Sequence, residues 1–254
     1  MSGTLILPET KKPLTRMQWR FLLFLNYKVE SAEIIDFLLP GLELDSFRSD
    51  YYCSLVACLT KPHSRQKSRF LKLSAESLAI RVYTKRKVGK RIHRGFVRPF
   101  CVAEQGGLRG SLQLTQSTKG LAMSHAATAQ SEADLLNIGG RIEYRWQVGK
   151  NSYHISGLTK GEYIPIPKTG FLPFIVNRDF FYQTARDGST LEHFIDTGFT
   201  QQLKVKEYSL FCDAVNTFGK DLNFLKNEPD SAVVFDGSDV TLREPTVLPV
   251  GCDL

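Results

Sequence analysis

The sequence lacks a hydrophobic run long enough to cross a membrane as a helix. The longest apolar run near its start is Phe21 to Leu25, and no later run approaches the roughly 20 residues that a membrane span requires. The first residues also lack the apolar core of a secretory signal. We therefore expect a cytoplasmic protein that does not insert into a membrane.

Cysteines are few, and neither they nor the histidines form a metal-binding pattern. The cysteines are odd in number, scattered and without a C-x-x-C pair: Cys53, Cys58, Cys101, Cys212 and Cys252. We interpret them as reduced thiols. None of the histidines has a metal-ligand spacing to a cysteine or a carboxylate: His63, His93, His125, His154 and His193. The sequence thus predicts no metal site.

The motifs of several common enzyme classes are also missing. No G-x-S-x-G, Walker A or G-x-G-x-x-G sequence occurs in the chain. The sequence therefore has no motif that indicates a hydrolase triad, nucleotide hydrolysis or a dinucleotide cofactor. We predict no cofactor.

The composition that remains is that of a soluble globular protein. With 254 residues, 42% of them hydrophobic and 23% charged, the chain can bury a substantial core. We expect a single domain over residues 1–254, with residues 1–13 as a flexible arm because they carry two prolines and no hydrophobic period. The formal charge of +7 permits an anionic partner without indicating nucleic acid by itself.

Short alternating segments separated by turn residues dominate the chain. In RIEYRWQV, residues 141–148, the apolar side chains Ile142, Tyr144 and Trp146 share one face, and Gly149 begins a turn into the next such segment. Helical patterns are few and short. We predict a mainly β (α+β) fold, in which an antiparallel sheet closes on itself to hide its edges and carries a few short peripheral helices.

One predicted hairpin, Leu78 to Arg98, carries an unusual pair of arginines. If Gly89 and Lys90 form its two-residue turn, counting back along both strands places Arg81 opposite Arg98. Two arginines so placed repel each other unless an anion lies between them. We interpret this hairpin as the wall of an anion site, with Tyr83 on the same face as Arg81. The alternative is a structural ion pair of the arginines with Glu76, Glu104 or Glu143.

The tip of the same hairpin supports a different hypothesis. Its basic side chains could grip nucleic-acid phosphates, as β-ribbons sometimes do: Lys85, Arg86, Lys87, Lys90, Arg91, His93 and Arg94. The alternative is a solvated turn whose charges keep the strand edge from pairing. We favour the solvated turn, because the net charge of the chain is modest.

Several segments resemble a known family when they are taken in order. They are LPGLELDSF, YYCSLVACL, AIRVYTKRKV, MSH, GRIEYRW, ARDGSTLEHF, FCDAVNTFG and SAVVFDGSDVTL. Their order and spacing, from about Met17 to Arg243, resemble the YqjF-like family of unknown function in the acetoacetate decarboxylase superfamily. The resemblance implies a closed, conical antiparallel β-barrel with a central pocket.

The same resemblance bears on catalysis. Decarboxylases of this superfamily form an imine between a keto acid and one lysine of a Lys-Lys pair that precedes a methionine like Met123. Gln116 and Ser117 stand at the places of that pair, so the resemblance implies that the pair is absent. The nearest lysine is Lys119, which could be a displaced imine-forming lysine or an ordinary surface lysine.

These observations lead to two functional hypotheses besides nucleic-acid binding. The first is a small-molecule-binding protein that holds an organic anion or amphiphile through Arg81, Arg98, Tyr83 and Gln116. The second is a decarboxylase or lyase that acts on a keto acid through an imine; its candidate catalytic residues are Lys119, Glu104 and His125. The sequence does not indicate the ligand, the oligomeric state or the pathway.

Overall fold

A computed structural model describes residues 8–63, 74–104, 118–128 and 136–248 of the chain. The strands are β1 (Pro13–Val29), β2 (Glu43–Leu44), β3 (Tyr51–Pro62), β4 (Ala75–Val88), β5 (Arg91–Glu104), β6 (Thr118–Ala127), β7 (Arg141–Val148), β8 (Asn151–Pro165), β9 (Phe180–Thr184), β10 (Thr190–Asp196), β11 (Gln201–Phe211), β12 (Ser231–Arg243) and β13 (Thr246–Leu248). The helices are α1 (Ser31–Ile34), α2 (Phe171–Val176) and α3 (Ala214–Phe218), with short 3-10 turns at Pro8–Thr10, Ile35–Phe37 and Asn223–Lys226.

All strands belong to one sheet, and two extra pairings close it on itself. The sheet runs in the order β13-β10-β9-β5-β6-β7-β8-β11-β12-β1-β3-β4-β2, and β4 also pairs with β5. This pairing completes a large ring through β6, β7, β8 and β11. A second extra pairing, β10 with β12, completes a small ring through β9 and β10. The predicted mainly β fold with few, short helices is confirmed, and the sheet closes as expected.

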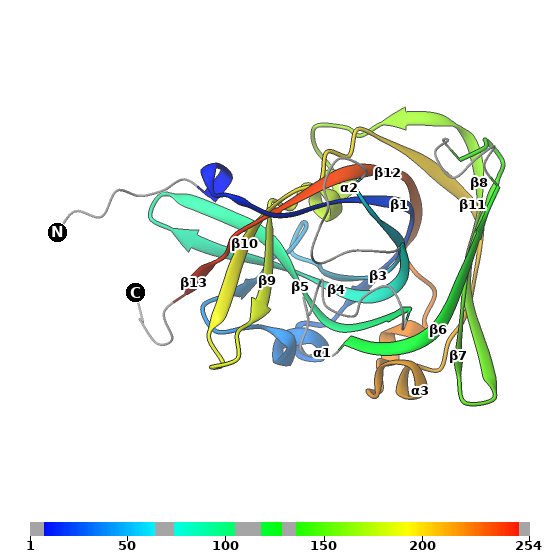
Figure 1. Cartoon of the computed structure of the whole chain (residues 1–254), viewed down its shortest axis with the longest axis horizontal. Helices are drawn as coiled ribbons and strands as arrows, with labels where there is room; N and C mark the ends of the chain where they lie inside the picture. The colour runs from blue at the N-terminus through cyan, green and yellow to red at the C-terminus, as the bar shows by residue number, and fades with distance from the viewer. Residues whose placement is uncertain (1–7, 64–73, 105–117, 129–135, 249–254) are drawn as a thin grey trace.

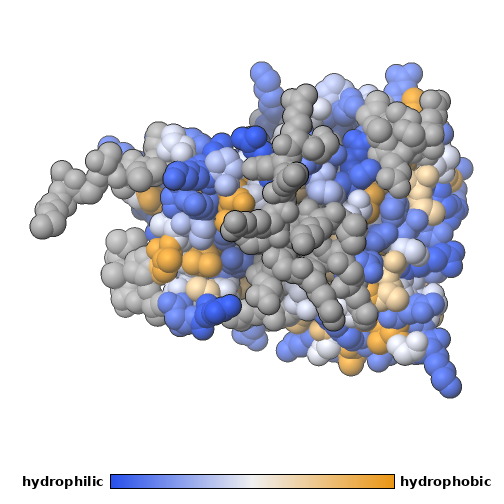
Figure 2. Space-filling view, in the orientation of Figure 1, coloured by the Kyte–Doolittle hydropathy of each residue, from blue (hydrophilic) through white to orange (hydrophobic). Residues whose placement is uncertain are grey.

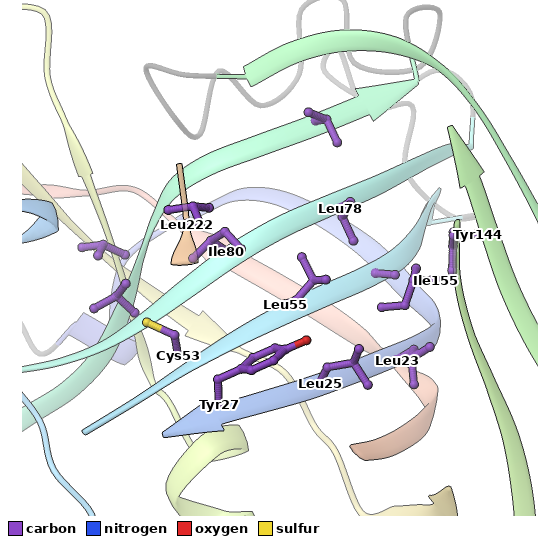
Figure 3. Close-up of a cluster of buried hydrophobic side chains, with 14 of the residues drawn as sticks. Leu23, Leu25, Tyr27, Cys53, Leu55, Leu78, Ile80, Tyr144, Ile155 and Leu222 are labelled. Carbon is purple, nitrogen blue, oxygen red and sulfur yellow. The ribbon is translucent and has the colours of Figure 1, made fainter. Parts of the chain in front are cut away.

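The two rings share a wall made of β12, β1, β3, β4 and β5, which lies between β7–β8 on one side and β9–β10 on the other (Figure 1). Successive side chains of a strand point to opposite faces, so this wall carries two hydrophobic clusters. On the large-ring face, Leu23, Leu55 and Leu78 belong to a cluster that Tyr144 and Ile155 join from β7 and β8 (Figure 3). We call this cluster the large core.

The other face of the wall carries a cluster that we call the small core. Trp19, Phe24, Val56 and Phe96 belong to it, and Phe181 of β9 joins them from across the small ring. Because both faces of the wall are buried, its strands are almost continuously apolar rather than alternating. The outer surface is mostly hydrophilic with scattered hydrophobic residues, as the view in Figure 2 shows.

Two of the pairings are parallel, which differs from the expected antiparallel sheet. Strand β5 pairs in parallel with β6 and with β9. Neither partner follows β5 through a tight turn, since 13 residues separate β5 from β6 and β9 enters after α2. A connection of that length allows the chain to return and run parallel to the strand it left.

The described part of the predicted N-terminal arm is held against the sheet. Lys11 Nζ donates to the Pro245 carbonyl at 3.0 Å, and the Arg243 guanidinium donates to the Lys11 carbonyl at 2.7 Å. Residues 8–13 of the expected arm thus include contacts to the sheet, and its flexibility stays a prediction. Lys11 contacts Arg243 at the end of β12 and Pro245 just after it.

Gly95 is needed where β9 approaches β5 to close the small ring. A Cβ atom at this position would lie 2.5 Å from the Phe180 carbonyl oxygen and 2.5 Å from the Tyr182 ring. We predict that Gly95→Ala lowers the free energy of unfolding in urea by about 3 kcal/mol, because the paired strands must separate. Gly149→Ala serves as the control, since a Cβ there meets nothing within 4 Å and only the φ of +61° opposes it, at about 1–2 kcal/mol. A Gly95→Ala loss no larger than that of the control would contradict the close approach.

Candidate anion site

The β4–β5 hairpin brings Arg81 and Arg98 together, with one change to the predicted register. Val88 pairs with Arg91, so the turn at Gly89 and Lys90 is confirmed. A register shift follows between Ile80 and Val82, where the single Arg81 opposes two residues, Arg98 and Pro99. Proline has no N–H to give to the ladder, which suits it to such a bulge. Both arginines face the small ring, because both line one pocket there.

Arg81 lies among aromatic rings on the small-core face. Its guanidinium carbon is 4.0 Å from the Phe96 ring centroid and 5.0 Å from that of Phe24, and the residue is 5% exposed. The guanidinium of Arg98 lies 4.7 Å from the Phe181 ring. A cation over a ring face in a desolvated site gains about 2 kcal/mol, which offsets part of the cost of burial. The rings also hold both planar groups in place.

Neither arginine forms an ion pair with a carboxylate in the part of the chain that the structure describes. The Nε atoms of Arg81 and Arg98 are buried and have no hydrogen-bond partner there. Two of the carboxylates considered as partners are occupied elsewhere: Glu76 pairs with His125 at 2.8 Å, and Glu143 with Arg145 at 2.8 Å.

Burial lowers the pKa values of both arginines. Burial, together with the positive charge of Arg98, lowers the pKa of the Arg81 guanidinium to about 10. Burial also lowers the pKa of Arg98. Both groups still carry their charge at neutral pH, so the small core contains two neighbouring cations whose charge no carboxylate compensates within the described residues.

Two adjoining pockets open beside these guanidinium groups. Both are lined by Trp19, Thr60, Ser77 and Arg98. Their empty volumes, which include the open solvent at the mouths, are about 530 Å³ and about 340 Å³. The first pocket extends toward Phe181, Ile195 and Leu242, and the second reaches Arg81. The lining thus combines two cations and a few hydroxyl groups with a largely apolar wall. Such a site can orient a small anion with an apolar portion.

Tyr83 lies further along the same face of β4, and it supports the site rather than lining it. Its hydroxyl is 2.5 Å from Ser54 Oγ, which in turn donates to Asn26 at 2.6 Å. Its ring also carries the buried guanidinium of Arg178, 4.9 Å away. Burial raises the pKa of the Tyr83 hydroxyl, so it stays neutral. Gln116, the remaining predicted ligand-binding residue, lies outside the described residues.

The three candidate catalytic residues do not gather at the arginines. Thr118 lines the larger pocket, whereas the next residue, Lys119, is exposed and donates from Nζ to the Asn216 carbonyl at 2.8 Å. His125 contacts Glu76 on the large-core face of the wall and packs near Phe21. Glu104 is half-buried at the end of β5.

The aromatic lining of the site was not anticipated from the sequence. Trp19 and Phe181 come from strands far from the hairpin, and only the closure of the small ring places them beside Arg98. The period of β4 would have placed Ser77 and Ala79 on the face of Arg81, where the pocket has them.

Cys58 also lines the pocket, but burial raises the pKa of its thiol to about 12, so it is no thiolate nucleophile.

The basic tip of the hairpin makes several internal ion pairs. Arg86 and His93 both contact the buried carboxylate of Glu192 at 3.2 Å. Lys85 pairs with Glu43, and Arg94 with Asp45, each at 3.8 Å. Lys87, Lys90, Arg91 and Arg94 are the exposed cations of the tip, and of these Arg94 contacts Asp45. This leaves less free charge for nucleic-acid phosphates than the sequence suggested.

Two kinds of feature are absent from the described residues. No three histidine, cysteine or acidic side chains come together there as a metal site. No helix in the same ranges combines the length and the hydrophobicity that crossing a membrane requires.

A family model matches most of the chain. Residues 16–197 match the model of the DUF2071 family, whose members are described as an uncharacterized conserved protein. No curated protein matches the chain.

Several solved structures share the fold. The enduracididine biosynthesis enzyme MppR, complexed with pyruvate, is 12% identical with a TM-score of 0.60, over 98% of this chain and 94% of that one. An acetoacetate decarboxylase-like enzyme from Sphingomonas wittichii RW1 is 11% identical with a TM-score of 0.57, over 98% and 99%. An acetoacetate decarboxylase from Legionella pneumophila is 11% identical with a TM-score of 0.56, over 98% and 92%. The expected acetoacetate decarboxylase-like fold is therefore confirmed.

The uncompensated charge of Arg81 gives a prediction about stability. We expect Arg81→Met to leave the free energy of unfolding unchanged or to raise it by about 1 kcal/mol, because an apolar chain of similar length replaces an unpaired buried cation. Arg178→Met is the matched contrast: Arg178 is equally buried but pairs with Asp45, so its removal costs about 3 kcal/mol. Urea unfolding of both variants measures the difference. Equal losses would mean that Arg81 has a partner in the folded protein.

Proposed function

We propose that this chain, which belongs to the DUF2071 family of uncharacterized conserved proteins, binds a small organic anion between Arg81 and Arg98 in the small core. The observation that carries the proposal is the pair formed by the buried Arg81 and the half-buried Arg98, whose guanidinium groups share a pocket and have no carboxylate partner among the described residues. A buried charge is normally paired. A bound anion supplies the missing charge.

The geometry favours a carboxylate with a short apolar remainder. A carboxylate has two oxygens that accept N–H bonds from planar guanidinium groups, and such charge-assisted bonds are stronger than neutral ones. The rest of the ligand then lies against Trp19, Phe181 and Ile195 in the larger pocket. MppR, which has a related fold, has a solved structure in complex with pyruvate. This supports the choice of a small keto acid as the first probe.

Binding alone is the form of the proposal that the described residues favour. The imine mechanism needs a neutral lysine amine beside the keto carbon. The described lining of both pockets contains arginine but no lysine, and Lys119 extends to Asn216 instead. The decarboxylase hypothesis remains a prediction that depends on Lys119 reaching the ligand.

A thermal-shift titration with pyruvate tests the binding proposal. A ligand at a hundredfold excess over its Kd stabilises the folded state by about 2.7 kcal/mol, which raises the Tm of a chain of this size by about 5–10 °C. We predict this rise for the unmodified protein and its loss in Arg81→Met and Arg98→Met. Arg91→Met is the control, because Arg91 is exposed at the hairpin tip. An equal rise in Tm in all four proteins would mean that Arg81 and Arg98 do not bind the ligand.

Borohydride reduction separates binding from imine chemistry. We predict that the protein incubated with pyruvate and borohydride gains no mass, because the exposed Lys119 holds a backbone carbonyl outside the pocket. Intact-mass spectrometry followed by peptide mapping makes the measurement. A pyruvate-derived adduct on Lys119 would instead support the decarboxylase hypothesis.

A further inference from the structure

We propose a second anion site outside the small core, built to take a phosphoryl group that carries two negative charges. It lies in an open pocket between the turn that precedes β3, the basic strand β5 and the segment around α2. The residues that the argument uses are Phe47, Arg48, Arg94, Lys168, Thr169 and Arg178. None of them lines the two pockets beside Arg81 and Arg98, so this proposal does not depend on the proposed function.

The pocket has the size and openness to admit a phosphate ester from solvent. Its empty volume is about 760 Å³, which includes the solvent at its mouth. Arg48 and Lys168 are exposed at the rim, and the side chain of Arg94 is 52% exposed. The turn that carries Arg48 is closed by two backbone hydrogen bonds between Phe47 and Asp50, at 2.9 and 3.0 Å. The rim is therefore positioned by the backbone while its cations remain accessible.

Arg178 forms the floor of the pocket, and one of its guanidinium nitrogens, Nη2, has no hydrogen-bond partner among the described residues. The residue is 2% exposed, and its guanidinium donates from Nη1 to Asp45 and from Nε to the Phe174 carbonyl, each at 2.5 Å. Nη2 is buried too, and no partner for it exists among the described residues. The guanidinium is also held over the rings of Phe174 and Tyr83, at 4.2 and 4.9 Å. A fixed, buried N–H donor without an acceptor costs free energy unless a ligand supplies one.

The charge balance of the pocket favours a dianion over a simple carboxylate. Four cationic side chains line it, and the neighbouring Asp45 is the carboxylate that contacts two of them, Arg178 and Arg94. After that pairing, about three positive charges remain uncompensated. A monocarboxylate leaves most of this charge unbalanced, whereas a phosphoryl group carries close to two charges above neutral pH and has three acceptor oxygens. Arginine forks suit those oxygens, and the hydroxyl of Thr169 adds a neutral donor.

Isothermal titration calorimetry at pH 8 with inorganic phosphate, and in a second arm with glycerol phosphate, tests the site. The double variant R48Q/K168Q removes two rim cations and should bind at least tenfold more weakly. The matched control K87Q/K150Q removes two exposed cations elsewhere and should bind as the unmodified protein does. Arg81→Met should also bind phosphate normally, which keeps this test apart from that of the small-core site. Binding in both arms indicates an ester ligand; binding of inorganic phosphate alone indicates the free ion.

A labelling experiment locates the bound anion directly. Acetylation of lysine amines, followed by peptide mass spectrometry, should be at least threefold slower at Lys168 when phosphate is present and unchanged at Lys150. No heat of binding in either arm would overturn the proposal. So would an equal loss of affinity in the two double variants, or equal protection of both lysines.

Discussion

The shared wall of the two rings is buried on both faces by the large core and the small core. A charged side chain that is buried in this wall therefore needs a partner inside the protein. Arg81 lies in the middle of this wall, where it is 5% exposed and cannot turn outward to water. Arg178, which packs beside the wall, shows the usual solution, since it pairs with the buried carboxylate of Asp45. Arg81 and Arg98 have no such carboxylate in the described structure. The cost of leaving them uncompensated is what makes their pocket a candidate ligand site.

Two irregularities in the wall's strands determine which side chains reach that pocket. In β1, Phe21 adopts a φ of 52° and the register with β3 shifts, so Trp19 and Leu22 face the same side although they are three residues apart. In the hairpin, the bulge at Arg98 and Pro99 of β5 gives Arg81 two facing residues instead of one. A bulge redirects a side chain without breaking the sheet. The small core therefore has two cations together with an aromatic lining.

The sequence predicted the parts of this arrangement that depend on local pattern. Alternating segments and glycine turns indicated a mainly β fold, and the Gly89 turn placed Arg81 and Arg98 on facing strands, as the structure has them. It could not predict the bulge or the closure of the small ring, because both depend on contacts between distant strands. Phe181 reaches Arg98 only through the parallel β5–β9 pairing, and the segment of Gln116 lies outside the described residues.

The central claim is that the guanidinium groups of Arg81 and Arg98 hold an anion, and NMR observation of their buried Nε–H groups tests it most directly. Titration with pyruvate should shift the Nε–H resonances of Arg81 and Arg98, assigned through the two methionine variants, and should leave the resonance of the carboxylate-paired Arg178 in place. Unchanged resonances of Arg81 and Arg98 at saturating pyruvate and at saturating concentrations of other small carboxylates would contradict the account.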